Sequence, residues 1–163
     1  MHIISIANTG IVQVTALLLR FPAWPLSTSH PDLKNNLLTG YNFYSDNYNP
    51  DDDHGHGTHV AGIAAGSGSA LSNTMKGVAY ESDLVLVPTS MNDSDIADAI
   101  LYAAGLTSDP SNPEPVDIIN LSLGSKYESS IITDVVEITA NNSDTIIVAA
   151  SGNENSSIGY PAA

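Results

Sequence analysis

The sequence contains no cysteine, and only four of its 163 residues are lysine or arginine. Without cysteine the chain can form no disulfide, thiol nucleophile or cysteine-based zinc site, and the redox compartment cannot be read from it. Eighteen acidic residues against four basic ones give a formal net charge of −14. Because like charges repel, we expect neither nucleic acids nor anionic membranes as partners.

The sequence also lacks a run of 18 or more apolar residues that would indicate a membrane span. The apolar stretch at residues 11–19 is interrupted by Gln13 and Thr15. It has neither the basic flank nor the small-residue cleavage site of a secretory signal. Hydrophobic residues nevertheless make up 42% of the chain, which together with its length suits one folded domain with its own core.

Apolar runs of strand length alternate with helical patterns along the chain. The runs are residues 3–7 (IISIA), 83–87 (DLVLV), 116–122 (VDIINLS) and 145–150 (TIIVAA). Residues 95–104 place Ile96, Ile100 and Leu101 on one face, and residues 129–141 do the same with Ile131, Val135, Ile138 and Thr139. Near-continuous apolar runs are typical of parallel strands buried on both faces. The pattern predicts a mostly parallel α/β sheet flanked by helices, with ligands bound beyond the carboxyl ends of the strands.

The segment most suggestive of chemistry is residues 51–66 (DDDHGHGTHVAGIAAG), which holds His54, His56 and His59. Glycines on both sides of His56 leave room for a ligand to approach the backbone. We expect Thr58 to cap a helix of small residues that packs into the core. A solvated histidine-rich loop would seldom be followed by such a helix, so a histidine here is expected to act, most simply as a general base.

Two further segments follow apolar strands. Residues 120–124 (NLSLG) are either a simple turn or an extended edge that pairs with a peptide. Residues 149–154 (AASGNE) are either a Gly-Asn turn or a backbone-lined cavity beside the amide of Asn153. An amide donor aimed at developing negative charge is what acyl transfer requires.

Together, and in this order, residues 54–62, 120–124 and 149–154 resemble the subtilisin-like serine proteases, peptidase family S8. Supporting matches are residues 29–33 (SHPDL), 76–79 (KGVA) and 160–162 (YPA), so the resemblance covers residues 29–163. It implies a three-layer α/β fold with a mostly parallel sheet, incomplete on its C-terminal side. Residues 1–28 are then an atypical N-terminal segment with the first strand, and residues 29–163 a partial peptidase domain.

The resemblance implies peptide-bond hydrolysis by a Ser–His–Asp triad. His56 would be the general base and Asn153 the oxyanion donor. Residues Ser122, Leu123 and Gly124 would pair with substrate backbone, and Ala149, Ala150, Ser151 and Gly152 would form a wall of the specificity pocket. The family also implies a polypeptide substrate, no required cofactor, and a secreted or cell-envelope location.

The first departure from the family concerns the triad aspartate. The best match is residues 6–11 (IANTGI), which puts Asn8 at the position of the acid. An amide cannot stabilise imidazolium as a carboxylate does, and an aspartate-to-asparagine change in such a triad lowers kcat about 10⁴-fold. Residues 12–28 do not resemble the family, and are either an insertion or a misread gene start.

The second departure concerns the nucleophile. The 163 residues contain no Gly-Thr-Ser-Met-Ala-like motif. Ser90, in Thr89-Ser90-Met91, only imitates it, because it follows a strand-ending proline. We therefore expect the first part of a larger catalytic domain that is inactive alone, with the remainder of the domain missing. The alternative is a non-catalytic peptide-binding module, although an open sheet edge argues against a stable isolated one.

Two kinds of metal site remain open. Asp32 matches an aspartate that often binds structural Ca²⁺ in the family, and the oxygen-rich loop from Asp46 to Asp53 is a second candidate; a solvated acidic loop is the simpler interpretation of either. His54, His56 and His59 also have the H-x-H-x-x-H spacing of zinc hydrolases. However, Thr58 stands where such sites carry an acid before the last histidine.

Overall fold

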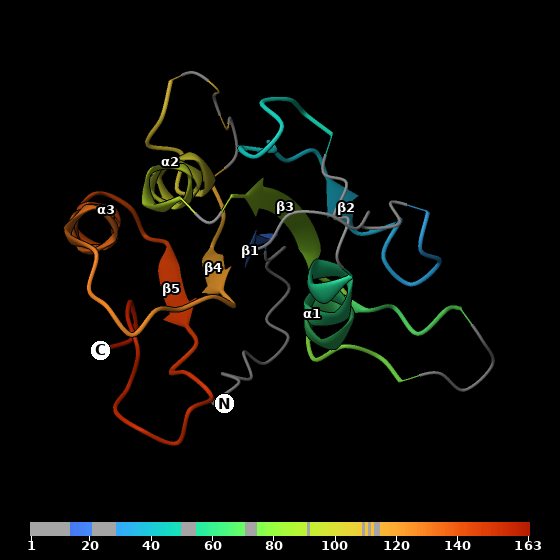
Figure 1. Cartoon of the computed structure of the whole chain (residues 1–163). Coiled ribbons are helices and arrows are strands. Elements are labelled where there is room, and N and C mark those ends of the chain that lie inside the picture. The colour runs from blue at the N-terminus through green and yellow to red at the C-terminus, as the bar shows by residue number, and fades with distance from the viewer. Residues whose placement is uncertain are drawn as a thin grey trace.

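The computed structural model of the chain describes residues 14–20, 29–49, 55–70, 75–90, 92–108, 110, 112 and 115–163. Figure 1 shows the elements in chain order: β1 (Val14–Arg20), β2 (Leu37–Leu38), α1 (His56–Ala65), β3 (Asp83–Thr89), α2 (Asp93–Ala103), β4 (Ile118–Leu121), α3 (Ser130–Asn142) and β5 (Ile146–Ala149). Among these described elements, no helix is long and apolar enough to cross a membrane.

The five strands form one parallel sheet in the order β2-β3-β1-β4-β5. The central strand, β1, pairs with β3 from Val14↔Asp83 to Arg20↔Thr89, and with β4 on its other side. The predicted parallel α/β architecture is confirmed. The position of β1 was not foreseen: it lies within residues 12–28, where the sequence predicted no element, whereas the strand expected at residues 3–7 falls outside the described residues.

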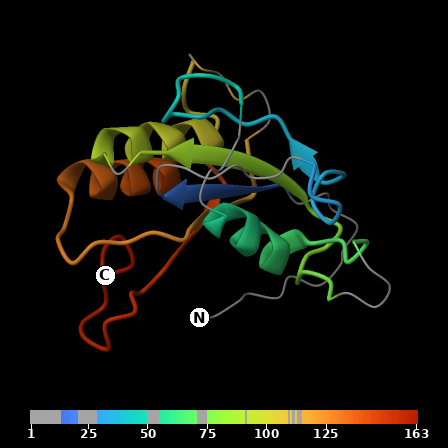
Figure 2. The same cartoon turned by 45° about the vertical axis from the view of Figure 1, so that its right-hand side comes forward.

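Helices cover both faces of the sheet, with α2 and α3 on one side and α1 on the other (Figures 1 and 2). β3 shows why its sequence is apolar without alternation. Val85 and Val87 belong to the core beneath α2 and α3, while Leu84 and Leu86 belong to the core beneath α1. All four side chains are at most 3% exposed. A strand buried on both faces needs apolar residues at every position.

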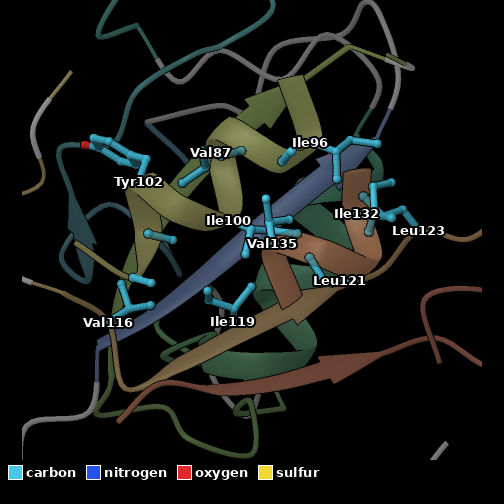
Figure 3. Close-up of a cluster of buried hydrophobic side chains, with 14 of the residues drawn as sticks. Val87, Ile96, Ile100, Tyr102, Val116, Ile119, Leu121, Leu123, Ile132 and Val135 are labelled. Atoms are coloured by element: carbon cyan, nitrogen blue, oxygen red, sulfur yellow. The ribbon is translucent and has the colours of Figure 1, made fainter. Parts of the chain in front are cut away.

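The larger core lies between the sheet and the helix pair α2–α3 (Figure 3). Ile96 and Ile100 point inward from α2 as their spacing predicts, at 4% and 0% exposure. In α3 the predicted stripe is partly wrong, because Ile131 and Ile138 are 50% and 45% exposed. Val135 and Thr139 are buried as predicted, and Ile132 turns inward in place of Ile131 and Ile138. The 3.6-residue period allowed either stripe, and docking against α2 selects the second.

The carboxyl end of α1 is held by hydrogen bonds that satisfy its last carbonyl groups. The bonds run from Gly77 N–H to Gly66 O at 2.7 Å, from Val78 N–H to Ile63 O at 3.0 Å, and from Ala79 N–H to Ala64 O at 2.7 Å. The side-chain amide of Asn36 donates to Ala65 O at 3.2 Å. Since Asn36 directly precedes β2 and residues 77–79 precede β3, this end of α1 lies near the amino ends of those strands.

Candidate functional site

The ends of β4 and β5 bring two of the predicted segments together. The last paired residues of the two strands are Leu121 and Ala149, and Ala150 N–H donates to Leu121 O at 3.1 Å. Residues 122–124 and 150–153 therefore leave the sheet side by side at its carboxyl edge. This is where ligands bind in open parallel sheets.

A third segment closes onto this edge from the C-terminal part of the chain. Ser125 and Tyr160 form an antiparallel bridge, with N–H to O distances of 3.0 and 2.9 Å. Gly159 N–H donates to Ser151 O at 3.0 Å. At Gly124 an added Cβ would lie 3.2 Å from Tyr160 O, so this tight approach favours glycine. The segment around residues 160–162, which resembles the family, therefore lies against both of the other segments.

His56 is the first residue of α1 and is exposed. The helix begins after Gly55, whose φ of 76° is a left-handed conformation that glycine adopts readily. The prediction that Thr58 caps the helix is wrong: the N-cap is Gly55, without a side-chain hydrogen bond. Because the other end of α1 is held at the amino ends of β2 and β3, His56 lies toward the carboxyl edge of the sheet, as Figure 2 shows for the helix as a whole.

The zinc alternative depends on three histidines, of which the structure describes two. His56 and His59 are both exposed in the first turn of α1, and residues three apart on a helix share a face. His54 lies outside the described residues. Among the residues that are described, no group of three or more histidine, cysteine, aspartate or glutamate residues could hold a metal ion. The zinc site stays a prediction.

Asn153 lies in an exposed loop after β5. Its backbone N–H donates to Glu154 Oε2 at 3.0 Å, whereas its side-chain amide has no hydrogen-bond partner within the described part of the chain. Gly152 has a φ of 103°, and a Cβ there would lie 2.9 Å from the Glu154 carboxylate. The loop conformation thus favours glycine before Asn153 and leaves the asparagine amide available as a donor.

Asp32 fixes the loop that follows α1. Its Oδ1 accepts the N–H of Ala70 at 2.6 Å, its backbone O accepts the N–H of Ser67 at 2.9 Å, and Ser69 Oγ donates to Pro31 O at 2.9 Å. Calcium requires six to eight oxygen ligands. The Asp32 carboxylate accepts one N–H from the described loop, and residues 71–74 of that loop lie outside the described residues, so a calcium site here stays a prediction. The predicted role of Asp32 as a calcium ligand therefore rests on the resemblance alone.

Two positions decide how far a triad could be completed. Asn8 lies outside the described residues, so its place at the acid position stays a prediction. The described central strand ends at Arg20, which pairs with Thr89. Ser90 follows directly, and its Oγ accepts the N–H of Asn92 at 2.9 Å. Through this hydrogen bond Ser90 belongs to the turn between β3 and α2.

A cavity of about 230 Å³ lies beside the edge segments. The amino ends of α2 and α3, residues 123–125 and the Tyr160-Pro161 pair contribute to its lining. Leu123 and Gly124 are among the lining residues, whereas none of the predicted wall residues Ala149, Ala150, Ser151 and Gly152 is. Sequence reasoning missed this cavity because its walls come from segments far apart in the chain.

Comparison with known proteins covers nearly the whole chain. The model of the family described as "Subtilase family" matches residues 2–163. A thermophilic serine proteinase of Bacillus sp. (strain AK1) is 37% identical over 137 residues, which are 79% of this chain and 31% of the relative. A subtilisin of Bacillus sp. (strain TA39) is 41% identical over 150 residues, which are 85% of this chain and 34% of the relative.

Solved structures agree with these relatives. Sphericase superposes with a TM-score of 0.71 at 32% identity, over 95% of this chain and 54% of its own. A protease from Pseudoalteromonas arctica PAMC 21717 gives 0.72 at 30% identity, over 88% of this chain and 50% of its own. The chain thus spans about half of these solved chains and about a third of the two Bacillus relatives.

Proposed function

Because the chain belongs to the subtilase family of serine peptidases, we propose that it supplies the general base and the substrate-binding edge of an endopeptidase that hydrolyses peptide bonds by acyl transfer. The observation that carries the proposal is the shared register of β4 and β5. It puts residues 122–124 beside residues 150–153 at the edge toward which His56 also lies. The proposed substrate is a polypeptide, and the proposed chemistry needs no cofactor.

Each group has a separate task in this mechanism. Residues Ser122, Leu123 and Gly124 pair through their backbone with an extended peptide as an added strand. His56 takes the proton of a serine supplied by chain beyond these 163 residues and returns it to the leaving amine. The amide of Asn153 donates to the oxyanion, and loss of that donor in subtilisin itself costs about 2.7–4 kcal/mol. Residues Ala149, Ala150, Ser151 and Gly152 are small enough to leave room for a substrate side chain.

We propose that the serine and the aspartate of the triad are both absent from these 163 residues. No Gly-Thr-Ser-Met-Ala-like motif is present, and the first acidic residue in the sequence is Asp32. Residues 1–31 therefore contain no carboxylate, either at Asn8 or after β1, that could complete the triad there. The 163 residues alone are proposed to bind extended peptides without cleaving them. The alternative function, a non-catalytic peptide-binding module, predicts the same result.

The proposed location is outside the cytoplasm or in the cell envelope. Its support is by analogy: one relative, 33% identical over 168 residues, is an extracellular protease of Xanthomonas campestris. Another relative of similar identity is the major intracellular serine protease of Bacillus subtilis. Fractionation of cells that produce the chain, with immunodetection in medium, envelope and cytoplasm, tests this part of the proposal.

The purified chain should be incubated with casein and with a covalent serine-hydrolase probe, and its binding to extended peptides should be measured by calorimetry. We expect neither turnover nor labelling, and we expect heat of binding. His56→Ala should leave binding unchanged, with His30→Ala as a matched control away from the edge. Casein turnover that His56→Ala abolishes would refute the proposed inactivity. Absence of binding to every peptide would refute the substrate-binding edge.

A further inference from the structure

β5 is the outermost strand on its side of the sheet, and no strand of the described residues lies beyond it (Figure 1). The N–H groups of Ile146 and Ala150 donate to carbonyl groups on the β4 side, at 2.9 and 3.1 Å. Backbone groups alternate in direction along a strand, so the N–H and C=O groups of Ile147 and Ala149 point away from β4. β5 therefore presents hydrogen-bonding groups along its outer edge.

The sequence of β5 does not protect this edge. Natural edge strands are kept from pairing with another chain by charged side chains, proline, a bulge or very short length. Residues 145–150 (TIIVAA) contain neither a charge nor a proline, and their register with β4 runs without a bulge from Ile146 to Ala149. At the opposite edge of the sheet, β2 is only two residues long. Another chain can therefore extend the sheet at β5 much better than at β2.

The distribution of charge also favours the β5 edge as the place where a second copy approaches. Two chains that each carry a net charge of −14 repel one another. The helices α2 and α3 contain no lysine, arginine or histidine, and their acidic residues are Asp93, Asp95, Asp98, Asp134 and Glu137. Residues 145–150 are uncharged, and the side chain of Ile146 is 49% exposed. Repulsion between two copies is therefore weaker at the β5 edge than at the α2–α3 layer.

Two copies of β5 complement each other as an antiparallel pair. When Val148 lies opposite Val148 of the partner subunit, Ile147 lies opposite Ala149 of the partner subunit. The outward backbone groups of both residues then find hydrogen-bond partners. Asp144 lies outside the paired residues 146–150. Because both copies use the same surface, the pair closes as a two-fold dimer and does not grow into a fibre.

We propose that the 163-residue chain forms a two-fold dimer through the outer edge of β5, so that two five-stranded sheets join into one. Val148 of each copy lies at the axis, where the side chains of a non-hydrogen-bonded pair come close together. Ile147 and Ala149 pack against the larger core, so Val148 and Ile146 point to the other face of the sheet. The contact thus adds apolar burial to backbone hydrogen bonds. It does not depend on the proposed function, because it requires no bound peptide.

Sedimentation velocity over a wide range of protein concentration tests the proposal, with circular dichroism of each variant as the check of folding. We expect the 17.0 kDa chain to sediment as a dimer that dissociates on dilution. Added NaCl should strengthen the dimer, because it screens the repulsion between the two copies. Val148→Lys should weaken the dimer about tenfold, because it places two like charges side by side at the axis. Since this change lowers the net negative charge, a weaker dimer cannot result from greater overall repulsion.

The matched control is Leu38→Lys, which adds the same charge at a 37% exposed leucine on the opposite edge of the sheet. It should leave the dimer unchanged. Amide hydrogen exchange of the unsubstituted chain is the second measurement, and it decides the question if Val148→Lys does not fold. The amides of Ile147 and Ala149 should exchange more slowly as the protein concentration rises, because pairing between copies protects them.

A monomer at every concentration would overturn the inference. A dimer that Leu38→Lys weakens as much as Val148→Lys would also overturn it, because the contact would then not be specific to the β5 edge. Slow exchange of the Ile147 and Ala149 amides in a monomer would show that another segment of the chain covers the edge, and would overturn the inference as well.

Discussion

Leu33 is one of three buried leucines in the small core that attaches α1 to the sheet. It is fully buried, and its partners in that core are Ala61 and Ala65 of α1 with Leu84 and Leu86 of β3. The change Leu33→Ala removes three carbon atoms, which at about 0.8 kcal/mol each gives about 2.4 kcal/mol of lost transfer free energy. The two alanines cannot extend into the space, so a cavity term adds to this loss.

We therefore expect Leu33→Ala to lower the free energy of unfolding by roughly 3–4 kcal/mol, within the range of about 2–5 kcal/mol seen for such truncations. Urea unfolding followed by circular dichroism measures the total. Amide hydrogen exchange shows where the stability is lost. Protection against exchange should fall more in α1 than in α2 and α3, because those two helices pack on the other face of the sheet. The variant should thus loosen the helix that carries His56.

The control for this variant is Met75→Ala, because Met75 is 93% exposed and lies just before residues 77–79, which hold the carboxyl end of α1. Its effect should stay within about 0.5 kcal/mol. A loss below about 1 kcal/mol for Leu33→Ala would refute the idea that α1 depends on this small core. Equal loss of protection in α1 and α3 would show that the two faces of the sheet do not loosen separately.

Two further predictions concern a phenol and a glycine. Burial, with a smaller effect of Tyr48, raises the pKa of Tyr102, so the unfolded chain loses this proton near pH 10 while the folded chain keeps it. The free energy of unfolding is then unaffected by this group below that pH and falls above it. Urea unfolding at about pH 9 and pH 11 should show a smaller fall in the free energy of unfolding for Tyr102→Phe than for the unsubstituted chain. An equal fall in both would contradict the assignment to Tyr102. Gly77→Ala should cost roughly 1–3 kcal/mol, because its Cβ would lie 2.5 Å from Gly66 N and 2.6 Å from Ala65 N; thermal unfolding no different from the unsubstituted chain would show that the end of α1 can shift freely.

The sequence predicts β3, β4 and β5 from their apolar runs. In β3 the run from Leu84 to Val87 is continuous because both faces are covered, whereas β4 and β5 keep apolar runs although several of their positions are only partly buried or exposed. β1 was missed although residues 14–20 form an equally apolar run. The first strand was predicted at residues 3–7 because that apolar run ends at the turn signal of residues 8–10, and the pairing of residues 14–20 with β3 and β4 could not be seen from the sequence.

The candidate site could be predicted only where strand ends fix it. Residues 122–124 and 150–153 follow two strands that neighbour each other in the sheet, so the rule for parallel sheets brings them together. The cavity that includes Leu123 required the amino ends of α2 and α3 to meet Tyr160, which no local pattern reveals. The cap of α1 was misassigned because Gly55 reaches its role through a left-handed conformation instead of a side-chain bond.

The central position of β1 has a consequence for how the protein forms. β1 is synthesised before both of its neighbours, yet Val14 pairs with Asp83 and Thr15 with Ile118. Pairings so distant in sequence make folding slow, and an unpaired apolar strand meanwhile favours aggregation. The middle of the sheet cannot close on both sides until β4 has left the ribosome. The edge that positions residues 122–124 and 150–153 is therefore among the last parts of these 163 residues to assemble.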